Sequence, residues 1–530
     1  MTSRRVDYQG ALSDDEGADV VDTRHHHEHF HDEDVGSEGS IERNSLEIDG
    51  SGSTENGDEL APSKASHKTI GKIGSYAIAV NALAGPGILQ LPSTYQQSGI
   101  IPTTLALIVV GLVSALCCMH TANVVSKVPG NSSFDKVIEF SDPYRIFWGR
   151  RAYYGTQVIF YLCTLCVNIA AIVDTSQIVD SFFGHSAMGT WGFAFDTGEW
   201  THWIHREPCS KDEVETGDCL PFYADEYGNI VLTLGYVITT LVFVPLCLLD
   251  LKENTAWQIF GFVVLLTICF QFAICFTLDG LDFNNVTVWG ESWSSMLGVI
   301  LFNFGLVMAI PSWLVEKKEN VSVTRVVYGS TTISLVLYIV VGLLGALAIP
   351  NISPNALEPM TSGAFGTPLR IGASFFAFVI IGLDIPLFAV LTRYNLVNSG
   401  LCSTRIANLF VVYLPWSISW LFYQGTAVSE LLSWGGILFT GALAFLLPLY
   451  LAIRVLRIND EDALEGSLVG GSIDVYLGLV KSRASELKTT MIVMIVSCAC
   501  VALAIWGQVY HVKHGIHGTI PTQDFNSTGD

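Results

Sequence analysis

A succession of long apolar segments, each separated from the next by a polar one, limits this chain more than any other feature. A helix needs about 20 mostly apolar residues to cross the hydrocarbon core of a bilayer. Eleven segments meet that length: 70–98, 101–126, 151–183, 229–249, 256–278, 293–315, 324–349, 367–391, 405–423, 431–454 and 489–512. We therefore predict an all-α integral membrane protein with eleven transmembrane helices within residues 70–512.

Charge is scarce in these segments and concentrated before them. Only 14% of the residues are charged, against about 25% in soluble domains. Residues 1–69 hold 17 Asp and Glu against 6 Lys and Arg. That segment has no apolar periodicity, so we predict a disordered acidic tail, in which the His-rich run His25–His31 is solvated rather than metal-binding. The composition excludes a soluble enzyme and a nucleic-acid-binding protein.

The positions of Lys and Arg predict the orientation, because cytosolic loops carry an excess of both. With the N-terminus in the cytosol, 23 of the 27 Lys and Arg residues fall in inner segments or at the inner ends of spans. We therefore predict a cytosolic N-terminus and an outer or luminal C-terminal tail, residues 513–530. The plasma membrane and the vacuole or lysosome both fit this pattern.

Two outer loops and one inner segment carry further predictions. Cys209 and Cys219 lie ten residues apart in the outer loop 184–228, where a disulfide is favoured over free thiols. Asn285 begins an Asn-Val-Thr sequence in another outer loop and is a candidate glycosylation site. The inner segment 133–148 alternates apolar and charged residues, which predicts an amphipathic helix at the membrane surface.

The first span contains a sequence that interrupts a helix. Pro86 has no N–H, and the glycines on both sides of it tolerate non-helical angles. The half-helix that follows would present free N–H groups and a positive dipole end, which suits a carboxylate. A simple proline kink is the alternative. The substrate-binding candidates here are Asn81, Gly85, Pro86, Gly87, Ile88 and Leu89.

The sixth span contains a similar interruption, because Gly305 and Pro311 bracket a stretch that could unwind. Its substrate-binding candidates are Asn303, Phe304, Ala309 and Pro311. Spans 1 and 6 open two halves of five spans each, and an odd number of spans makes the halves inverted in the membrane. Interruptions at matching positions of inverted halves indicate a substrate site at the membrane midplane.

Three motifs carry a resemblance to a known family. They are Asn81…Gly85-x-Gly87-Ile88-Leu89-x-x-Pro92, Phe302-x-Phe304…Pro311…Glu316 and Leu383-Asp384-Ile385-Pro386…Arg393. On these residues the chain resembles the amino acid/auxin permeases, which include sodium-coupled neutral and vacuolar amino acid transporters. The resemblance implies a leucine-transporter-type 5+5 inverted repeat plus one extra helix, carrying amino acids with a coupling cation. Pro86 replaces a small polar residue of many relatives, and Asp384 lies near a Thr of sodium-coupled members.

Asp384 is the deepest acidic residue of the predicted spans. An acid at the bilayer centre costs about 2.5–3.5 kcal/mol, and desolvation favours its protonated form. We therefore expect Asp384, with Asn81 as neighbour, to carry the coupling ion. A proton is favoured over sodium, which is the alternative ion, and a protonated structural Asp is the alternative role. Glu316 is expected to form a gate or a structural salt bridge, and Asp180, near the outer end of span 3, is expected to be solvated.

The leading functional prediction is a secondary active transporter of small, neutral L-amino acids. The alternative is an amino-acid sensor that signals through its cytosolic tail. The expected partners are an amino acid and the lipid bilayer, without nucleic acid and without a cofactor other than the coupling ion. No span carries a residue set with the spacing of a metal site or a catalytic triad, so we expect no enzymatic activity.

Overall fold

The computed structural model describes residues 68–186, 188–195, 198–204, 231–352, 356–423, 434–457, 473–480 and 482–515. They belong to one compact unit, residues 61–530. The predicted tail, apart from residues 68 and 69, lies outside the described residues, as do Cys209, Cys219 and most of 513–530. The described chain is mostly helical, with one small sheet.

Eight helical segments of the described chain are long and apolar enough to cross a membrane. They are α3 (Ile100–Ser126), α5 (Arg150–Gly184), α8 (Leu251–Asp279), Met296–Glu316, α11 (Val323–Ala348), Thr367–Val397, Gly436–Arg457 and α20 (Arg483–Gly515). Three of these segments consist of more than one helical element. Met296–Glu316 contains α9 (Met296–Phe302), η4 (Leu306–Ala309) and α10 (Ile310–Glu316), and Thr367–Val397 contains α13 (Thr367–Phe375), η5 (Phe376–Ile381) and α14 (Gly382–Val397). Gly436–Arg457 contains η7 (Gly436–Leu446) and α18 (Leu447–Arg457). The protein is therefore a multi-pass helical membrane protein.

The other three predicted spans are helical where expected but short or interrupted, so the number eleven is not confirmed. Span 1 is divided into α1 (Lys72–Asn81), the 3-10 helix η1 (Pro86–Gln90) and α2 (Leu91–Ser98). Span 4 is the 14-residue helix α7 (Leu234–Cys247). Span 9 is divided into α15 (Thr404–Asn408), the π-helix η6 (Leu409–Tyr413) and α16 (Leu414–Leu421).

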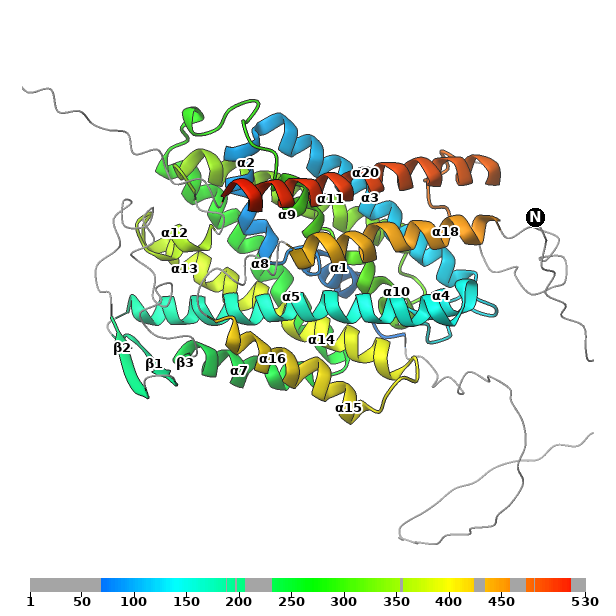
Figure 1. Ribbon diagram of the computed structural model, residues 1–530, viewed down its shortest axis with the longest axis horizontal. Helices are drawn as coiled ribbons and strands as arrows, with labels where there is room; N and C mark the ends of the chain where they lie inside the picture. Colours follow the sequence, from blue (N-terminus) through cyan, green and yellow to red (C-terminus); the bar gives the residue numbers. More distant parts are fainter. Residues whose placement is uncertain are drawn as a thin grey trace, which may run out of the picture. The chain divides into compact units, whose positions relative to one another are not determined.

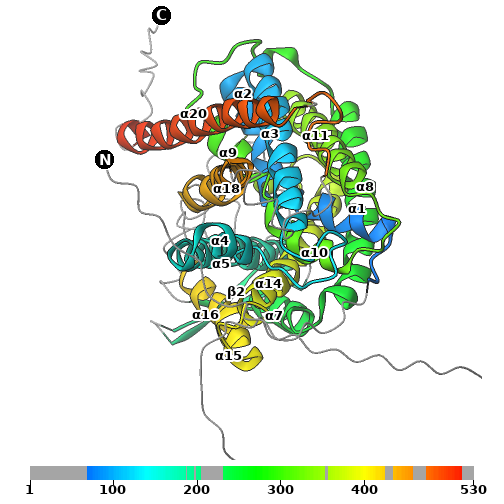
Figure 2. The same cartoon turned by 90° about the vertical axis from the view of Figure 1, so that its right-hand side faces the viewer.

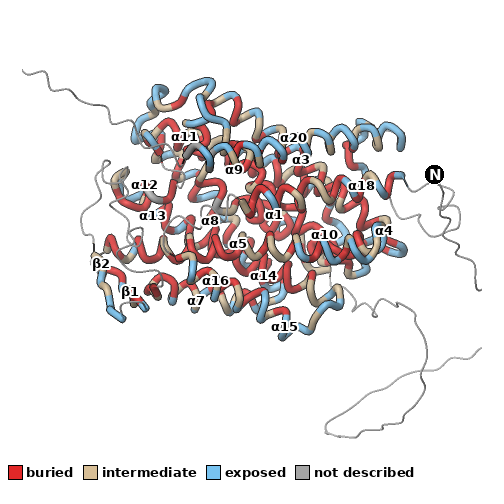
Figure 3. The backbone as a smooth tube through the Cα atoms, viewed as in Figure 1, coloured by how far each residue is buried: buried red, intermediate tan, exposed pale blue. Residues whose placement is uncertain are grey.

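The composite segments Met296–Glu316 and Thr367–Val397 are the most deeply buried of the eight candidate spans, whereas α20 runs along one side of the bundle (Figure 1). In their most apolar stretches, the segments Met296–Glu316 and Thr367–Val397 are 89% and 83% buried, against 33% for α8 and for α20. Figure 2 shows α20 at the rim with α10 well inside, and Figure 3 shows the same contrast in burial. A break in a membrane helix leaves backbone N–H and C=O groups without their helical partners. Such breaks are tolerated where other parts of the protein, rather than lipid, surround them.

The polar connections gather at two ends of the bundle. At one end, called here the α1 end, Asn398 donates to Glu139 at 2.7 Å, and Lys68 contacts Asp135 at 2.6 Å. At the opposite end, the N–H of Gly290 donates to the Ser98 carbonyl at 2.9 Å. Segments predicted to lie on one side of the membrane therefore meet each other in the fold.

The predicted amphipathic helix over 133–148 is wrong for its first half. Helix α4 covers only Asp142–Trp148, and residues 133–141 form a loop whose Phe134 has a left-handed φ of 60°. Phe134, Ile138 and Phe140 are buried in the core. The apolar side chains of this loop pack into the core while Asp135 and Lys136 stay exposed, so the alternation belongs to a folded loop and not to a surface helix.

A three-stranded antiparallel sheet lies at the opposite end. It consists of β1 (Thr190–Ala194), β2 (Glu199–Trp203) and β3 (Val231–Thr233) in the order β2-β1-β3. Gly192 is paired with Thr201 of β2 and with Thr233 of β3. At the same end, η3 (Phe283–Asn285) and the short helix α12 (Leu357–Thr361) belong to further connections. The sheet joins the C-terminal end of α5 to α7, because Thr190 of β1 and the Gly235 N–H of α7 both donate to Asp180.

Candidate functional site

The two interrupted spans meet at a small cavity in the centre of the bundle. Its volume of about 20 Å³ is about what one water molecule requires. Five elements contribute its lining: Ala82, Leu83 and Gly85 from span 1; Phe302, Asn303, Gly305 and Met308 from span 6; Val167 from α5; Asp384 and Phe388 from α14; and Thr440 from η7. A larger ligand would enter only after these side chains had moved apart.

The interruption of span 1 is confirmed, and it has the predicted cause. Helix α1 ends at Asn81, and the chain resumes as a 3-10 helix that begins at Pro86. Gly87 is packed against span 6, because a Cβ on this glycine would lie 2.5 Å from Asn303 Oδ1. Only a glycine allows the two interrupted spans to approach so closely.

The interruption of span 6 is also confirmed. Helix α9 ends at Phe302, and Pro311 lies in the first turn of α10 after the 3-10 turn η4. Asn303 lies at the break, where its Nδ2 donates to the Val299 carbonyl at 2.9 Å. Its Oδ1 accepts no hydrogen bond from any described residue, so one polar atom at the cavity is left free for a ligand.

Asp384 faces the same cavity from α14. The residue is 1% exposed, and neither carboxylate oxygen has a hydrogen-bond partner among the described residues. Gly85 lies directly opposite, since a Cβ there would be 3.0 Å from Asp384 Oδ2. A buried polar group without a partner costs free energy, so this carboxyl indicates a site that is completed by a proton or a ligand.

Asn81 contributes to the site through α8 rather than through direct contact with Asp384. Its Nδ2 donates to the backbone carbonyl and to Oε1 of Gln258, both at 2.8 Å. Gln258 in turn donates to the Leu383 carbonyl at 3.1 Å. This chain of hydrogen bonds links α1, α8 and α14 next to Asp384, and Asn81 Oδ1 has no partner among the described residues.

Tyr338 of α11 is a site residue that the sequence analysis missed. Its hydroxyl contacts the Leu83 carbonyl and lies 2.9 Å from the Asn303 carbonyl, so it bridges the two breaks. The ring is fully buried and meets Phe304 edge-on, with centroids 5.4 Å apart. Tyr338 lies in α11, an apolar span without a predicted break, so nothing in the neighbouring sequence marked it as a site residue.

The remaining predicted residues lie around the cavity rather than in its lining. Ile88, Leu89, Phe304 and Ala309 are buried in the apolar core. Pro86 begins η1. The wall residues Val167, Met308, Phe388 and Thr440 were not predicted. Of these, Thr440 is the residue that the sequence could have pointed to, because it is the one hydroxyl-bearing residue in the apolar segment Gly436–Leu446.

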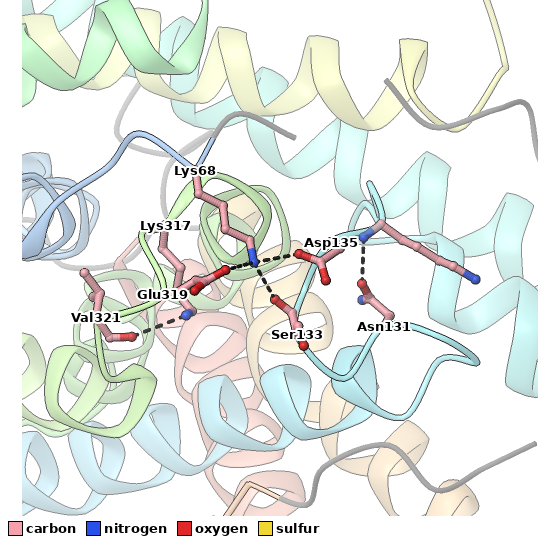
Figure 4. A network of polar contacts seen from close by, with 8 residues as sticks. Lys68, Asn131, Ser133, Asp135, Lys317, Glu319 and Val321 are labelled. Atoms are coloured by element: carbon pink, nitrogen blue, oxygen red, sulfur yellow. Dashed lines mark hydrogen bonds and ion pairs between the residues drawn. The ribbon is translucent and has the colours of Figure 1, made fainter. Parts of the chain in front are cut away.

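The α1 end is closed by polar contacts around the start of the described chain (Figure 4). Lys68 Nζ lies 2.6 Å from Asp135 and 3.3 Å from Glu319, and it donates to the Ser133 carbonyl at 3.1 Å. The hydrogen bond to Asp135 raises the pKa of Lys68. This lysine therefore ties the loop 127–141 to the segment that follows α10.

Glu316, the predicted gate residue, takes part in this closure through its backbone. Its carbonyl accepts from the N–H groups of Thr69 and Ile70 at 2.8 and 3.0 Å. Nearby, the Trp313 indole donates to Ser75 Oγ at 3.0 Å and joins α10 to α1. At the α1 end, the first part of span 1 and the last part of span 6 are thus held together.

A buried carboxyl, Glu139, lies in the same region. Ser312 of α10 and Asn398, after α14, each donate to one of its oxygens at 2.7 Å. Burial raises the pKa of Glu139 to about 7, against the two hydrogen bonds, which lower it. Asp142 and Glu316 raise this pKa further, so the loop carries a carboxyl that can change charge near neutral pH.

The comparison with protein families agrees with this geometry. The model of the transmembrane amino acid transporter protein family matches residues 68–398, more than half of the chain. The chain belongs to the transmembrane amino acid transporter family. It is a transporter and not an enzyme. No curated protein matches the chain.

The matched range of this transporter family contains both interrupted spans, Tyr338, Asp384 and Glu139. It ends at residue 398, so Thr440 of η7 lies outside it. Most of the cavity lining therefore belongs to the part of the chain that the family shares.

The predicted modifications of the transporter stay predictions. Asn285 Nδ2, the atom that would carry a glycan, donates to the Leu347 carbonyl at 3.0 Å. Cys209 and Cys219 lie outside the described residues. The ten cysteines of the described chain are free thiols.

Proposed function

We propose that this chain is a secondary active transporter that moves small, neutral L-amino acids across a membrane by alternating access. Its eleven spans form two inverted halves of five, followed by one extra helix. The proposal is supported by the two interruptions, which lie in the first span of each half and meet at one cavity. In transporters built from inverted repeats, broken helices of this kind form the substrate site.

The chemistry of the cavity suits an amino acid. Pro86 has no N–H, and the Ile88 N–H donates to the Gly85 carbonyl at 3.2 Å. The proposed donor to the substrate carboxylate at the start of η1 is therefore the Gly87 N–H. The free oxygens of Asn303 and Asp384 suit the ammonium group. Val167, Met308 and Phe388 form apolar walls, and they favour a small, uncharged side chain.

Asp384 carries the coupling ion in this proposal, and the ion is a proton. The carboxyl is buried without an ion-pair partner among the described residues. A carboxyl in such a place is held in its neutral form until water or substrate reaches it. Release of its proton on one side of the membrane and uptake on the other would couple the proton gradient to transport.

Alternating access requires that the contacts at the α1 end open. Lys68 would leave Asp135 and Glu319, and the Glu316 carbonyl would release the N–H groups of Thr69 and Ile70. Glu316 is therefore proposed as a gate residue through its backbone. With the N-terminus in the cytosol, this gate faces the cytosol, and the protein resides in the plasma membrane or in the vacuole or lysosome.

The single observation that carries the proposal is the cavity between the two breaks, with Asp384 unbonded in its wall. Uptake of radiolabelled amino acids into proteoliposomes tests it, with a proton gradient, a sodium gradient or neither. We expect saturable accumulation of small neutral amino acids under the proton gradient. Accumulation under sodium alone would reassign the ion, and saturable binding without flux would favour a sensor.

A further inference from the structure

A second hollow lies at the α1 end, apart from the central cavity. It is a groove of about 650 Å³ between the start of α1, the first turns of α8 and the segment 317–320 after α10. Ile70 joins two of these walls, because it forms a β-bridge with Lys317 and its carbonyl accepts from the Lys318 N–H at 2.9 Å. Gly74 allows α1 to pack on α8, since a Cβ there would lie 2.7 Å from Thr255 Cγ2.

Three lysines line this groove, one from each wall. They are Lys72 at the start of α1, Lys252 in the first turn of α8, and Lys318. All three side chains are exposed, and none forms an ion pair with a described residue. No lining residue is acidic. The groove therefore presents concentrated positive charge.

The segments around the groove also carry carboxylates, and Glu253 follows Lys252 in the first turn of α8 without lining the groove. Glu319 lies 3.3 Å from Lys68, and Asp250 lies 3.6 Å from Arg393. Glu316 interacts electrostatically with Lys252. The described lining residues of the groove carry three positive charges and no negative one.

Apolar side chains border the groove on the side of α1 and α8. Ile73 lines the groove and is 67% exposed. Val263, one turn after the lining residue Ile259 of α8, is 58% exposed. Lysines near the ends of apolar membrane helices place their charged groups at the membrane–water interface. The lysines thus lie at headgroup depth, beside a surface that acyl chains cover.

We propose that this groove binds an anionic phospholipid. The three lysines hold the phosphate headgroup, and the acyl chains lie along the face of α8 that continues from Ile259 to the exposed Val263. Gly71 caps α1 without a side chain, so the first-turn N–H groups of α1 can assist the lysines. A soluble phosphate would use the lysines but not Ile73, and a neutral lipid would use Ile73 but not the lysines.

Binding of three short-chain probes to the purified full-length protein tests the proposal. The probes are dioctanoyl phosphatidylinositol 4-phosphate, its phosphorylated inositol headgroup alone, and dioctanoyl phosphatidylcholine. Microscale thermophoresis gives the affinities, and thermal unfolding establishes that each variant is folded. The test variant combines Lys72→Gln, Lys252→Gln and Lys318→Gln. The control combines Arg151→Gln, Arg405→Gln and Lys488→Gln, which removes three exposed cations elsewhere.

We expect the anionic lipid to bind more tightly than either other probe. The test variant should weaken this binding about a hundredfold, since each lysine contributes about 1 kcal/mol near a phosphate surface. The control should weaken it less than about threefold. Equal affinity for the headgroup alone, an equal loss in the control, or no preference over phosphatidylcholine would each overturn the proposal. Because no substrate is present, the outcome is independent of the transport proposal.

Discussion

Two buried aspartates in this bundle have opposite surroundings. Asp180 of α5 is fully buried, and its Oδ1 accepts from Thr190 Oγ1 at 2.5 Å and from the Gly235 N–H at 2.7 Å. The Tyr423 hydroxyl donates to its other oxygen. Asp384 is equally buried, but neither of its oxygens has a partner among the described residues.

The two environments indicate different roles for the two buried acids. Asp180 joins α5 to the three-stranded sheet and to α7, and its donors offset the cost of removing a carboxylate from water. The expectation that Asp180 is solvated was wrong for this reason. Asp384 has no such donors among the described residues, which is why we propose that it carries the coupling proton. A satisfied acid is structural, whereas an unsatisfied one is available for function.

The largest expected effect is at the unsatisfied acid. Asp384→Asn should abolish uptake driven by a proton gradient, because the amide imitates the neutral acid but cannot release a proton. Exchange of internal for external amino acid should persist. Proteoliposome uptake and counterflow measure the two activities. Accumulation at the wild-type level in this variant would remove Asp384 from the coupling mechanism.

The satisfied acid should give a stability effect instead. Asp180→Ala leaves the donors from Thr190, Gly235 and Tyr423 without their acceptor, at about 1–3 kcal/mol for each buried group. We expect a melting temperature lower by several degrees and less folded protein. Transport per folded molecule should change little. If Asp180→Ala instead removed coupling while leaving stability intact, the contrast between the two acids would fail.

Tyr338 tests whether the bonded groups around Asp384 also affect binding. Tyr338→Phe keeps the packing against Phe304 but leaves the Leu83 and Asn303 carbonyls without the hydroxyl. We expect KM to rise about tenfold, with surface expression unchanged. Tyr95→Phe is the matched control, since it removes a buried hydroxyl that contacts Thr104 at 3.1 Å, outside the cavity lining. An equal rise in KM for both variants would reduce Tyr338 to a general packing role.

Glu139 lies between the two extremes, with two donors and a pKa raised to about 7 by burial. Its folded-state pKa exceeds the ordinary value, so stability is full below about pH 4.5 and falls as the pH rises through 7. We expect a decrease in melting temperature of roughly 1–3 °C between pH 5 and pH 8. Glu139→Gln should flatten that dependence, measured by thermal unfolding across the pH range. An unchanged pH profile would assign the effect to other groups.

Local sequence accounted for much of this protein. Apolar segments of sufficient length predicted the spans, because a bilayer leaves few ways to satisfy the backbone. Gly85, Pro86 and Gly87 predicted the break in span 1, since they act on their own backbone. The depth of Asp384 along an apolar segment identified it as unusual. Each of these signals lies within a few residues of the feature that it specifies.

Only the tertiary structure decided which groups meet. Tyr338 lies 255 residues from Leu83, and Thr440 comes from an element outside the predicted breaks. Long-range packing also supplies the hydrogen-bond donors to Asp180, and it places residues 133–141 in a loop. The pattern of polar and apolar residues indicates how far each helix is exposed to lipid. It does not indicate which residue of a distant segment a side chain will contact. The sequence therefore determined where helices cross and break, while packing determined which buried acid is satisfied and which is free.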